Sequence, residues 1–524
     1  MRKALKYARL ILVLKISKYS VIITNKTTGK RTRIIWRGFF LRLFFLLFLA
    51  IFSLGGYFGY RFYDLERRVF QAAGTDQEII SVAGRSTFIE TAKNLITEEK
   101  VILRGEERKR INILLLGMGG EGHKGENLTD TIMLVSIDPE TYQVAFLSIP
   151  RDLYVNIPQT KIHTKINAVY AYEIQNEDKS TAYSLAKLKT TVKNVTGQEV
   201  DYYVALDFEG FKKVIDELGG IDIEVERDIL DDRYPGPNYS FETFDLKKGF
   251  HHLDGETALK YSRVRHVEGG DFGRAKRQQQ VLSAVKKKAF SLDNFTNLNR
   301  LNNLIDILGE HLKTDIHFNE ISTFLELTEN INIYQSTNKV LDAWSEDSLL
   351  ASSHVLLGGA MAYILIPRAR DYSQVHHLAE NIFDLAAIER KNEEIKKEKA
   401  KVVVFSDNYS NLYNITKIFE RWGYQVGMKQ DKELLEKCET ESLIFNNGKE
   451  AKVFTLDDLS GKLNAKMVEE SYSAYEDVDI LVCLSGEDST YLAGQIYDQK
   501  DEAEGLKEKS VVDEKGNILF NNEE

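Results

Sequence analysis

A chain of 524 residues is longer than one ordinary domain and predicts two folded units with connecting segments. Hydrophobic residues make up 43% and charged residues 28% of it, which excludes a disordered chain. The net charge is -10, yet residues 1–63 contain thirteen Lys or Arg and no Asp or Glu, so that residues 64–524 carry a net charge of -23. Such an acidic remainder excludes nucleic acid as a partner.

An apolar run after the basic tail predicts a membrane anchor. Residues 43–60 contain no charged side chain and are mostly Leu, Phe, Ile and Gly. Extended to residue 39, the run spans about 30 Å of hydrocarbon at about 1.5 Å per residue. Because the Lys/Arg excess precedes the run, we expect a cytoplasmic tail at 1–38, a single-pass helix at 39–62 and an extracytoplasmic remainder. A cleaved secretory signal is the alternative, but no small-x-small cleavage pattern follows the run.

The rest of the chain predicts a helical stalk and two α/β domains. Residues 63–110 are charged and helical in pattern, and from 111 strands alternate with helices, which predicts an α/β/α sandwich up to about residue 387. A charged linker at 388–400, a second, smaller α/β domain at 401–490 and a polar tail at 491–524 follow. In the first domain we expect strands at 111–116, 131–137, 143–149, 221–225 and 363–366, and helices at 208–218, 274–290 and 298–312.

Both cysteines, Cys438 and Cys483, fall in the predicted second domain. Cys483 lies within the apolar run 478–484, which is typical of a buried strand. Two thiols without neighbouring His or Cys do not form a zinc-binding pattern. The sequence leaves open whether the two thiols form a disulfide.

Two predicted strands of the first domain end in motifs suited to an anion. The first runs into Gly117-Met118-Gly119-Gly120-Glu121-Gly122, where glycines would let backbone amides approach a phosphate, although a flexible turn is an equal alternative. Strand 143–149 runs through Pro150 into Arg151 and Asp152, for which a structural ion pair is the alternative. Ligands of open α/β sheets bind beyond the carboxyl ends of strands, so we expect both motifs at one crevice.

Two further segments are rich in arginine. Arg263 and Arg265 are two residues apart, which in an extended chain would turn both guanidinium groups to one face, where they repel each other unless an anion lies between them. A predicted helix that opens at Asp271 carries Arg274 and Gln278 on the same face. The alternatives are an N-cap role for Asp271 and a solvated basic face for Arg274 and Arg277.

Arginine binds phosphate oxygens bidentately and keeps its charge, so these segments together predict a phosphorylated ligand. A carboxylate-bound Mg²⁺ commonly assists phosphoryl transfer. Asp130, at the start of strand 131–137, is therefore the expected Mg²⁺ ligand, and a turn aspartate is the alternative.

In their order along the chain, these motifs resemble the LytR–CpsA–Psr family over about residues 111–285. The resemblance is carried by 111–117, Thr129-Asp130-Thr131, Ile149-Pro150-Arg151-Asp152, Lys165-Ile166-Asn167-Ala168, 216–220, 253–259, 261–266 and 271–279. Residues 401–486 resemble, more weakly, the LytR C-terminal domain that is often attached to this family.

The resemblance implies a Mg²⁺-assisted phosphotransferase that moves a glycopolymer from a polyprenyl-pyrophosphate carrier to a peptidoglycan hydroxyl. It implies a metal ligand at Asp130, catalytic roles for Asp271, Arg263 and Arg265, and an apolar tunnel for the lipid. The residues that it implies in pyrophosphate binding are Arg151, Lys165, Arg263, Arg265, Arg274 and Gln278. Many relatives have a second metal-binding aspartate after the first strand, where this chain has Gly117-Met118-Gly119-Gly120, and Glu121 is the nearest substitute.

Two other functions fit the same motifs. Water could attack instead of a hydroxyl, which would make the protein a polyprenyl-pyrophosphate-sugar pyrophosphatase. The missing aspartate and the additional domain also fit a non-enzymatic envelope scaffold or regulator that binds lipid-linked glycan. Joined polymer among the products would distinguish a transferase from both.

Overall fold

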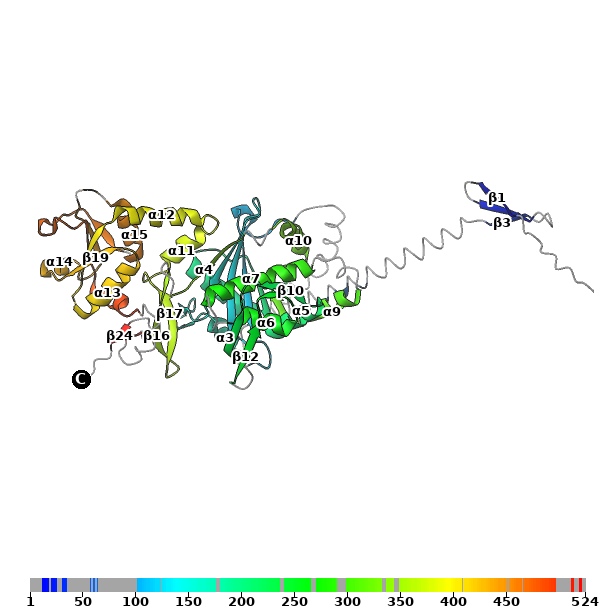
Figure 1. Ribbon diagram of the computed structural model, residues 1–524, viewed down its shortest axis with the longest axis horizontal. Helices are drawn as coiled ribbons and strands as arrows, with labels where there is room; N and C mark the ends of the chain where they lie inside the picture. The colour runs from blue at the N-terminus through cyan, green and yellow to red at the C-terminus, as the bar shows by residue number, and fades with distance from the viewer. Residues whose placement is uncertain are drawn as a thin grey trace, which may run out of the picture. The chain divides into compact units, whose positions relative to one another are not determined.

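The structure is a computed structural model in which the chain divides into two units, residues 1–65 and 66–524 (Figure 1). It describes residues 101–495 apart from 124, 176–179, 236–239, 265–269, 290–297, 332–335, 344–347, 408, 449, 451 and 464. It also describes 12–17, 20–25, 31–34, 57, 60, 61, 64, 510–512 and 518–520.

The first unit contains a small antiparallel sheet that was not predicted for the basic tail. Strands β1 (Leu12–Ser17), β2 (Ser20–Asn25) and β3 (Arg31–Ile34) pair in that order, with a two-residue connection between β1 and β2. Nearly all of the predicted transmembrane segment, 39–62, lies outside the described residues. Among the helices that are described, none has the length and apolar character needed to cross a bilayer.

The second unit is built around a mixed six-stranded sheet with the order β14-β9-β4-β5-β6-β15. Strand β4 is parallel to β9 and antiparallel to β5, and β6 is antiparallel to β5 and parallel to β15. The bounds are β4 (Ile111–Met118), β5 (Thr129–Ile137), β6 (Val144–Ile149), β9 (Tyr202–Asp207), β14 (Leu312–Thr314) and β15 (Thr337–Val340). The mixed α/β fold therefore agrees with the prediction.

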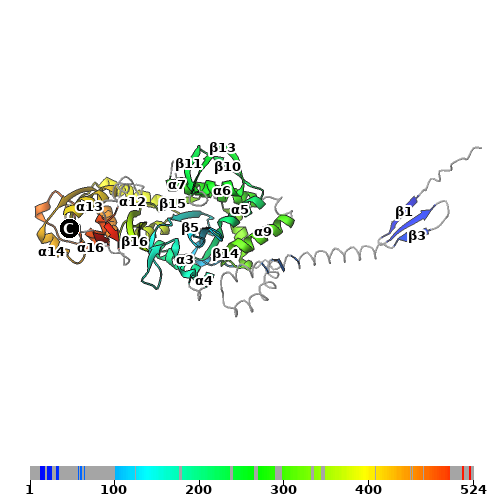
Figure 2. The same cartoon turned by 90° about the horizontal axis from the view of Figure 1, so that it is seen from below.

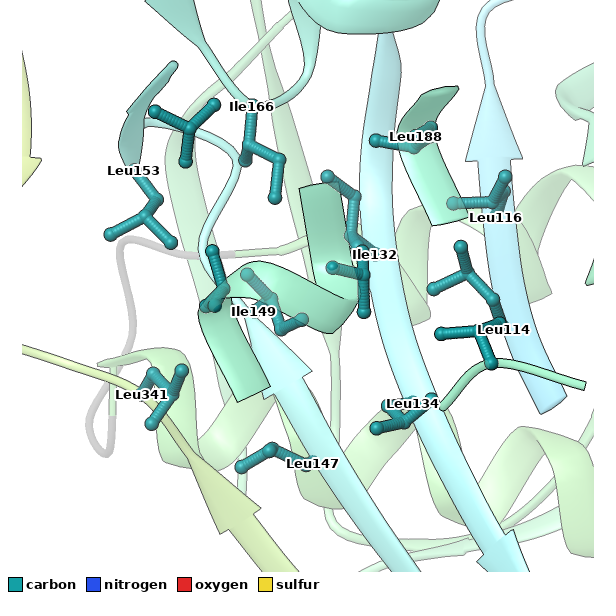
Figure 3. Close-up of a cluster of buried hydrophobic side chains, with 14 of the residues drawn as sticks. Leu114, Leu116, Ile132, Leu134, Leu147, Ile149, Leu153, Ile166, Leu188 and Leu341 are labelled. Carbon is teal, nitrogen blue, oxygen red and sulfur yellow. The ribbon is translucent and has the colours of Figure 1, made fainter. Parts of the chain in front are cut away.

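Apolar side chains that alternate along these strands build a core on each face of the sheet. On β4, Leu114 and Leu116 belong to the larger core (Figure 3), whereas Ile113 and Leu115 pack into the core on the opposite face. Helices α3 (Ala168–Ile174), α4 (Thr181–Thr196) and α11 (Ser373–Glu380) supply residues to the larger core, and α7 (Gly270–Ala289) and α10 (Ile321–Asn330) supply the other. Figure 2 shows α3 and α7 on opposite sides of β5.

A smaller subdomain with its own core follows β9 in the chain. Its elements are α5 (Phe208–Glu217), β10 (Ile221–Val225), β11 (Ile229–Pro235), β12 (Phe241–Leu246), β13 (Gly249–Leu253), α6 (Gly255–Arg263) and α9 (Leu298–His311). Buried residues of α5, α6, α7 and all four strands form this core. Helix α5 starts directly after β9, and Arg263 at the end of α6 lies over Phe208 at the start of α5.

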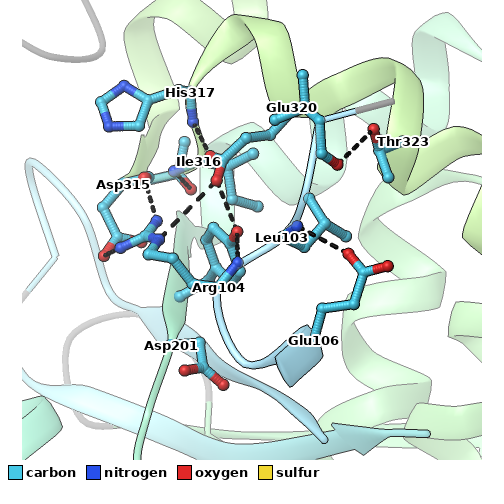
Figure 4. A network of polar contacts seen from close by, with 12 residues as sticks. Leu103, Arg104, Glu106, Asp201, Asp315, Ile316, His317, Glu320 and Thr323 are labelled. Carbon is cyan, nitrogen blue, oxygen red and sulfur yellow. Dashed lines mark hydrogen bonds and ion pairs between the residues drawn. The ribbon is translucent and has the colours of Figure 1, made fainter. Parts of the chain in front are cut away.

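The end of the predicted stalk packs on the sheet domain. Leu103 is buried, and the Arg104 guanidinium lies 3.8 Å from the centre of the Tyr202 ring. The same guanidinium pairs with Asp315 (Figure 4) at an N–O distance of 3.1 Å. The predicted boundary at 110/111 therefore lies too late in the chain, because residues 101–110 have tertiary contacts that their polar sequence does not indicate.

Residues 401–495 form a five-stranded sheet with the order β19-β18-β22-β20-β21. Its strands are β18 (Lys401–Phe405), β19 (Gln425–Lys429), β20 (Leu443–Asn446), β21 (Lys466–Val468) and β22 (Ile480–Cys483). The helices are α13 (Tyr409–Arg421), α14 (Lys432–Lys437), α15 (Val453–Leu463) and α16 (Gly486–Ala493), and α12 (Leu385–Glu398) precedes the sheet. A disulfide joins Cys438, at the end of α14, to the buried Cys483 of β22, which resolves the question that the sequence left open.

A hairpin connects the two sheets. Strands β16 (Leu350–Leu357) and β17 (Ala360–Pro367) pair over their full length, and the predicted strand at 363–366 lies within β17. The short strands β23 (Ser510–Val512) and β24 (Ile518–Phe520) extend this hairpin sheet. The Arg370 guanidinium pairs with Asp488 at 2.5 Å, which ties the end of the hairpin to α16.

Candidate functional site

The predicted motifs meet at one edge of the six-stranded sheet. From the strand directions, the carboxyl ends of β4, β6 and β9 and the amino end of β5 all lie there. Met118, at the end of β4, pairs with Thr129 on one side and with Asp207 on the other. This edge therefore holds Asp130, Arg151 and the glycine-rich loop, as the strand-end rule predicts.

Asp130, Arg151, Asp152 and Lys165 form a continuous ion-pair network at this edge. Arg151 Nη1 donates to Asp130 Oδ1 at 2.9 Å, and Lys165 Nζ donates to Asp152 Oδ1 at 2.7 Å. Arg151 Nε lies 3.5 Å from Asp152 Oδ2. Lys165 reaches the network because β8 (His163–Lys165) pairs with β7 (Tyr154–Asn156) directly after Asp152.

The network is partly open to solvent, with side-chain exposures between 23% and 36%, so a ligand can reach it. Burial alone would lower the pKa of Arg151, but Asp130 and then Asp152 outweigh it and raise that pKa above its usual 12.5. Arg151 is therefore a permanent cation in this place. The structural ion pair between Arg151 and Asp152, which was the alternative interpretation, is present, and its solvent exposure leaves it accessible to a ligand.

The glycine-rich loop after β4 is closed by its own backbone. Gly120 has a φ of +83°, and a Cβ there would lie 2.7 Å from the Cβ of Asp207, so the position requires glycine. The Gly120 amide donates to Glu126 O at 3.0 Å, and the His123 amide donates to Gly120 O at 3.1 Å. For these two amides the turn interpretation holds, because both are already used within the loop.

Arg263 is held over an aromatic ring at the same edge of the fold. Its guanidinium carbon lies 4.2 Å from the centre of the Phe208 ring, and His123 of the glycine-rich loop packs edge-on against that ring at 6.0 Å. The extended geometry predicted for Arg263 and Arg265 is wrong at its first residue, because Arg263 closes helix α6. Arg265 lies outside the described residues.

Helix α7 carries the remaining predicted residues. It begins at Gly270, one residue before the predicted start, so Asp271 lies in its first turn and is not its N-cap; the Asp271 side chain is outside the described part. Arg274 is half-buried, and Gln278 Nε2 makes a long contact of 3.5 Å with Ser262 O of α6. The alternative of a solvated basic face does not hold for Arg277, because this side chain is only 6% exposed and donates to carbonyl groups at the end of α6.

A second polar group, formed by Asp207 and His311 beside the glycine-rich loop, was not predicted from the sequence. Asp207 Oδ1 accepts from the Gly210 amide at 2.7 Å as the N-cap of α5, and Oδ2 lies 2.9 Å from His311 Nδ1. Lys213 Nζ lies 3.0 Å from the other nitrogen of the His311 ring. An aspartate before an amphipathic run is a cap signal, but no local pattern indicates the histidine, which lies 104 residues away.

The carboxylates at this edge of the sheet determine whether the implied Mg²⁺ would find the ligands that it needs. Within the described part of the chain, no group of three or more His, Cys, Asp or Glu side chains is arranged to hold a metal. Asp207 neighbours the place of the missing second aspartate, but both of its oxygens are engaged, and Glu121 is exposed in the turn after β4. Mg²⁺ often binds through one or two carboxylates and completes its shell with substrate phosphates and water. Asp130 fits that mode of binding.

A search of protein families agrees with this arrangement. The model of the LytR_cpsA_psr family matches residues 79–350, just over half of the chain. The chain belongs to this family. The match extends beyond the predicted span 111–285 at both ends and includes the packed segment 101–110.

The relatives in this family include named transferases. The chain is 30% identical over 346 residues to the polyisoprenyl-teichoic acid–peptidoglycan teichoic acid transferase TagV of Bacillus subtilis (strain 168), which covers 65% of this chain and 78% of TagV. It is 36% identical over 209 residues to the regulatory protein MsrR of Staphylococcus aureus (strain COL), covering 40% of this chain and 57% of MsrR. The crystal structure of Bacillus subtilis TagV matches with a TM-score of 0.39 and 29% identity, over 53% of this chain and 98% of that structure.

As a member of this family, the protein is an enzyme of the glycopolymer-transferase class.

Proposed function

We propose that this protein transfers a glycopolymer from a polyprenyl-pyrophosphate carrier to a hydroxyl of peptidoglycan. The observation that supports this most strongly is the meeting of Asp130, Arg151 and Lys165 at the sheet edge. TagV is named for the same pair of substrates, a polyisoprenyl-linked polymer and peptidoglycan. A pyrophosphate placed at this edge would meet fixed positive charge.

In the proposed reaction, the acceptor hydroxyl attacks the phosphorus that carries the glycan. A new P–O bond to the acceptor forms, the bond to the bridging oxygen breaks, and polyprenyl phosphate leaves. Arg151, Lys165 and Arg263 neutralise the phosphate oxygens, together with Arg265, Arg274 and Gln278 as proposed contacts. We assign Asp271 the role of accepting the proton from the hydroxyl.

Asp130 would hold the Mg²⁺, with Glu121 as a second proposed ligand. A bound Mg²⁺ supplies positive charge to the phosphate oxygens and orients them. In this structure the hydrogen bond from Arg151 Nη1 directs the Asp130 carboxylate along the sheet edge. A phosphate that bound to Arg151 would release Asp130 for this role.

We further propose that the apolar run at 39–62 is a single-pass anchor with the N-terminus in the cytoplasm. The run is long enough for a bilayer and follows the thirteen basic residues of the first 63. An anchored domain outside the membrane would meet both a lipid-linked donor and the cell wall. Labelling of a cysteine introduced at residue 2 or at Lys109 by a membrane-impermeant reagent would test this topology.

The test of function uses the full-length chain in detergent with Mg²⁺, a polyprenyl-pyrophosphate oligosaccharide and peptidoglycan fragments. We expect joined polymer and free polyprenyl phosphate, and we expect R151M to lose at least 100-fold of this activity. R390M is the matched control, because Arg390 is an exposed ion-paired arginine of α12. Released glycan phosphate without joined product would support the pyrophosphatase, and full activity of R151M would refute the site assignment.

A further inference from the structure

We propose that Arg277 is a positioning residue of the anion site: it fixes the end of helix α6 and acts on bound pyrophosphate through Arg263. This inference rests on the proposed function and assigns a role to a residue that the resemblance leaves without one. It concerns the contact between α6 and α7.

The last carbonyl groups of an α-helix have no partner within that helix. Helix α6 ends at Arg263, and its final carbonyls receive donors from α7. Arg277 Nε donates to Tyr261 O at 3.0 Å, and Arg277 Nη2 donates to Val264 O. Gln278, next in the chain, has its Nε2 3.5 Å from Ser262 O. A single guanidinium thus joins two carbonyls that flank Arg263 in the chain.

Burying the Arg277 guanidinium costs free energy, which indicates that this residue has a specific role. Arg277 is only 6% exposed, and burial, together with repulsion from Arg274 and Arg227, lowers the pKa of Arg277 to about 10, so it stays charged at neutral pH. A buried guanidinium is unfavourable unless its surroundings compensate the charge. The negative end of the α6 dipole and its carbonyls provide that compensation. The planar fork suits two carbonyls at once, which an ammonium group does not.

Arg263 receives its orientation from this clamp. The backbone is held two residues before it, at Tyr261, and immediately after it, at Val264. Its guanidinium then lies 4.2 Å above the Phe208 ring of α5. Without the clamp, the end of α6 can fray and carry Arg263 away from the ring.

The experiment measures binding of inorganic pyrophosphate with Mg²⁺ to the full-length chain in detergent by calorimetry. We expect R277M to bind at least tenfold more weakly than wild type, and R277K to bind at least fivefold more weakly at an unchanged melting temperature. K276M is the matched control, because Lys276 is the adjacent, exposed cation, ion-paired with Glu226 at 2.6 Å. It removes the same charge, and we expect a change below twofold.

A double-mutant cycle separates positioning from a general structural role. If Arg277 acts through Arg263, the variant R263M/R277M binds pyrophosphate no more weakly than R263M alone. Additive losses would overturn the proposal, because they would mean independent effects of the two residues. If R277M does not fold, R277K and R263M/R277K complete the same cycle.

The outcomes also separate this inference from the proposed function. A wild type that binds no pyrophosphate overturns both. A wild type that binds it, together with an R277K that binds equally well, overturns the positioning role alone. If pyrophosphate binding depends on Arg277 but the protein transfers no glycan, the positioning role is supported and the proposed function is refuted.

Discussion

Arg151 and Asp130 are joined by a hydrogen bond of 2.9 Å that runs from the end of β6 to the start of β5. The bond links a proposed phosphate contact to the proposed metal ligand, in neighbouring antiparallel strands. A phosphate group can replace Asp130 as the partner of Arg151, and a cation can replace Arg151 as the partner of Asp130. The site is therefore prepared for a phosphate and a cation that bind together.

The first prediction concerns Asp130. We expect D130N to lower transfer activity by about 100-fold, equivalent to about 2.7 kcal/mol of transition-state stabilisation, and to abolish its dependence on Mg²⁺. D152N is the control: Asp152 contacts Lys165 and Arg151 in the same network but is not a proposed metal ligand. Titration of activity against Mg²⁺ checks this. An unchanged Mg²⁺ dependence in D130N would exclude Asp130 as the ligand.

The second prediction concerns the ring beneath Arg263. A cation–π contact contributes about 1–2 kcal/mol when it is partly desolvated, so F208L should weaken pyrophosphate binding by about 5- to 30-fold. F208Y keeps an aromatic face and should bind within about threefold of wild type. Calorimetry with pyrophosphate gives the affinities, and melting curves identify any loss of folding. Equal binding by F208L and wild type would show that the ring does not orient Arg263.

The third prediction concerns the other end of the helix that carries Arg263. Asp254 caps α6 by accepting from the Thr257 amide at 2.8 Å, and the hydrogen bonds from the Thr257 side chain and backbone hold the pKa of Asp254 below its usual 3.8. A depressed carboxyl pKa contributes stability that is present above pH 3.8 and is lost as the pH falls through the lower, folded value.

We therefore expect D254A to lower the free energy of unfolding by about 1 kcal/mol at pH 7. The difference between D254A and wild type should shrink below pH 3.8. Denaturant unfolding between pH 7 and the acid range measures both. A difference that stays constant, or grows, toward low pH would contradict the capping role.

The fourth prediction concerns the disulfide between Cys438 and Cys483. Closing a loop of 45 residues restricts the unfolded chain, and the chain-entropy relation gives about 4 kcal/mol. Because Cys438 is 1% exposed and Cys483 is fully buried, we expect the intact protein to resist mild reductant. We expect C438S/C483S to lower the melting temperature of residues 401–495 while pyrophosphate binding at the first sheet is unchanged. Equal melting of the variant and wild type would contradict a stabilising role.

Local periodicity predicted three of the six strands of the sheet, β4, β5 and β6, and helices α5, α7 and α9, because alternation and helical spacing are properties of neighbouring residues. Strands β9, β14 and β15 were not predicted. Local periodicity also predicted that Asp130 and Arg151 would share an edge, because residues at strand ends are brought together by the sheet rule itself. The chain order of the motifs was sufficient for the family. Sequence alone thus determined the mixed α/β fold class, the family and the meeting of Asp130 and Arg151 at one edge.

Tertiary structure alone decided which side chains meet across large separations. Arg263 was expected on an extended chain, but helix α6 ends at that residue and turns it onto Phe208. A solvated face was the alternative for Arg277, but packing of α7 against α6 buries this side chain. Asp207 contacts His311 because α9 packs against α5. Such contacts depend on how whole elements pack, and no spacing of nearby residues encodes that geometry.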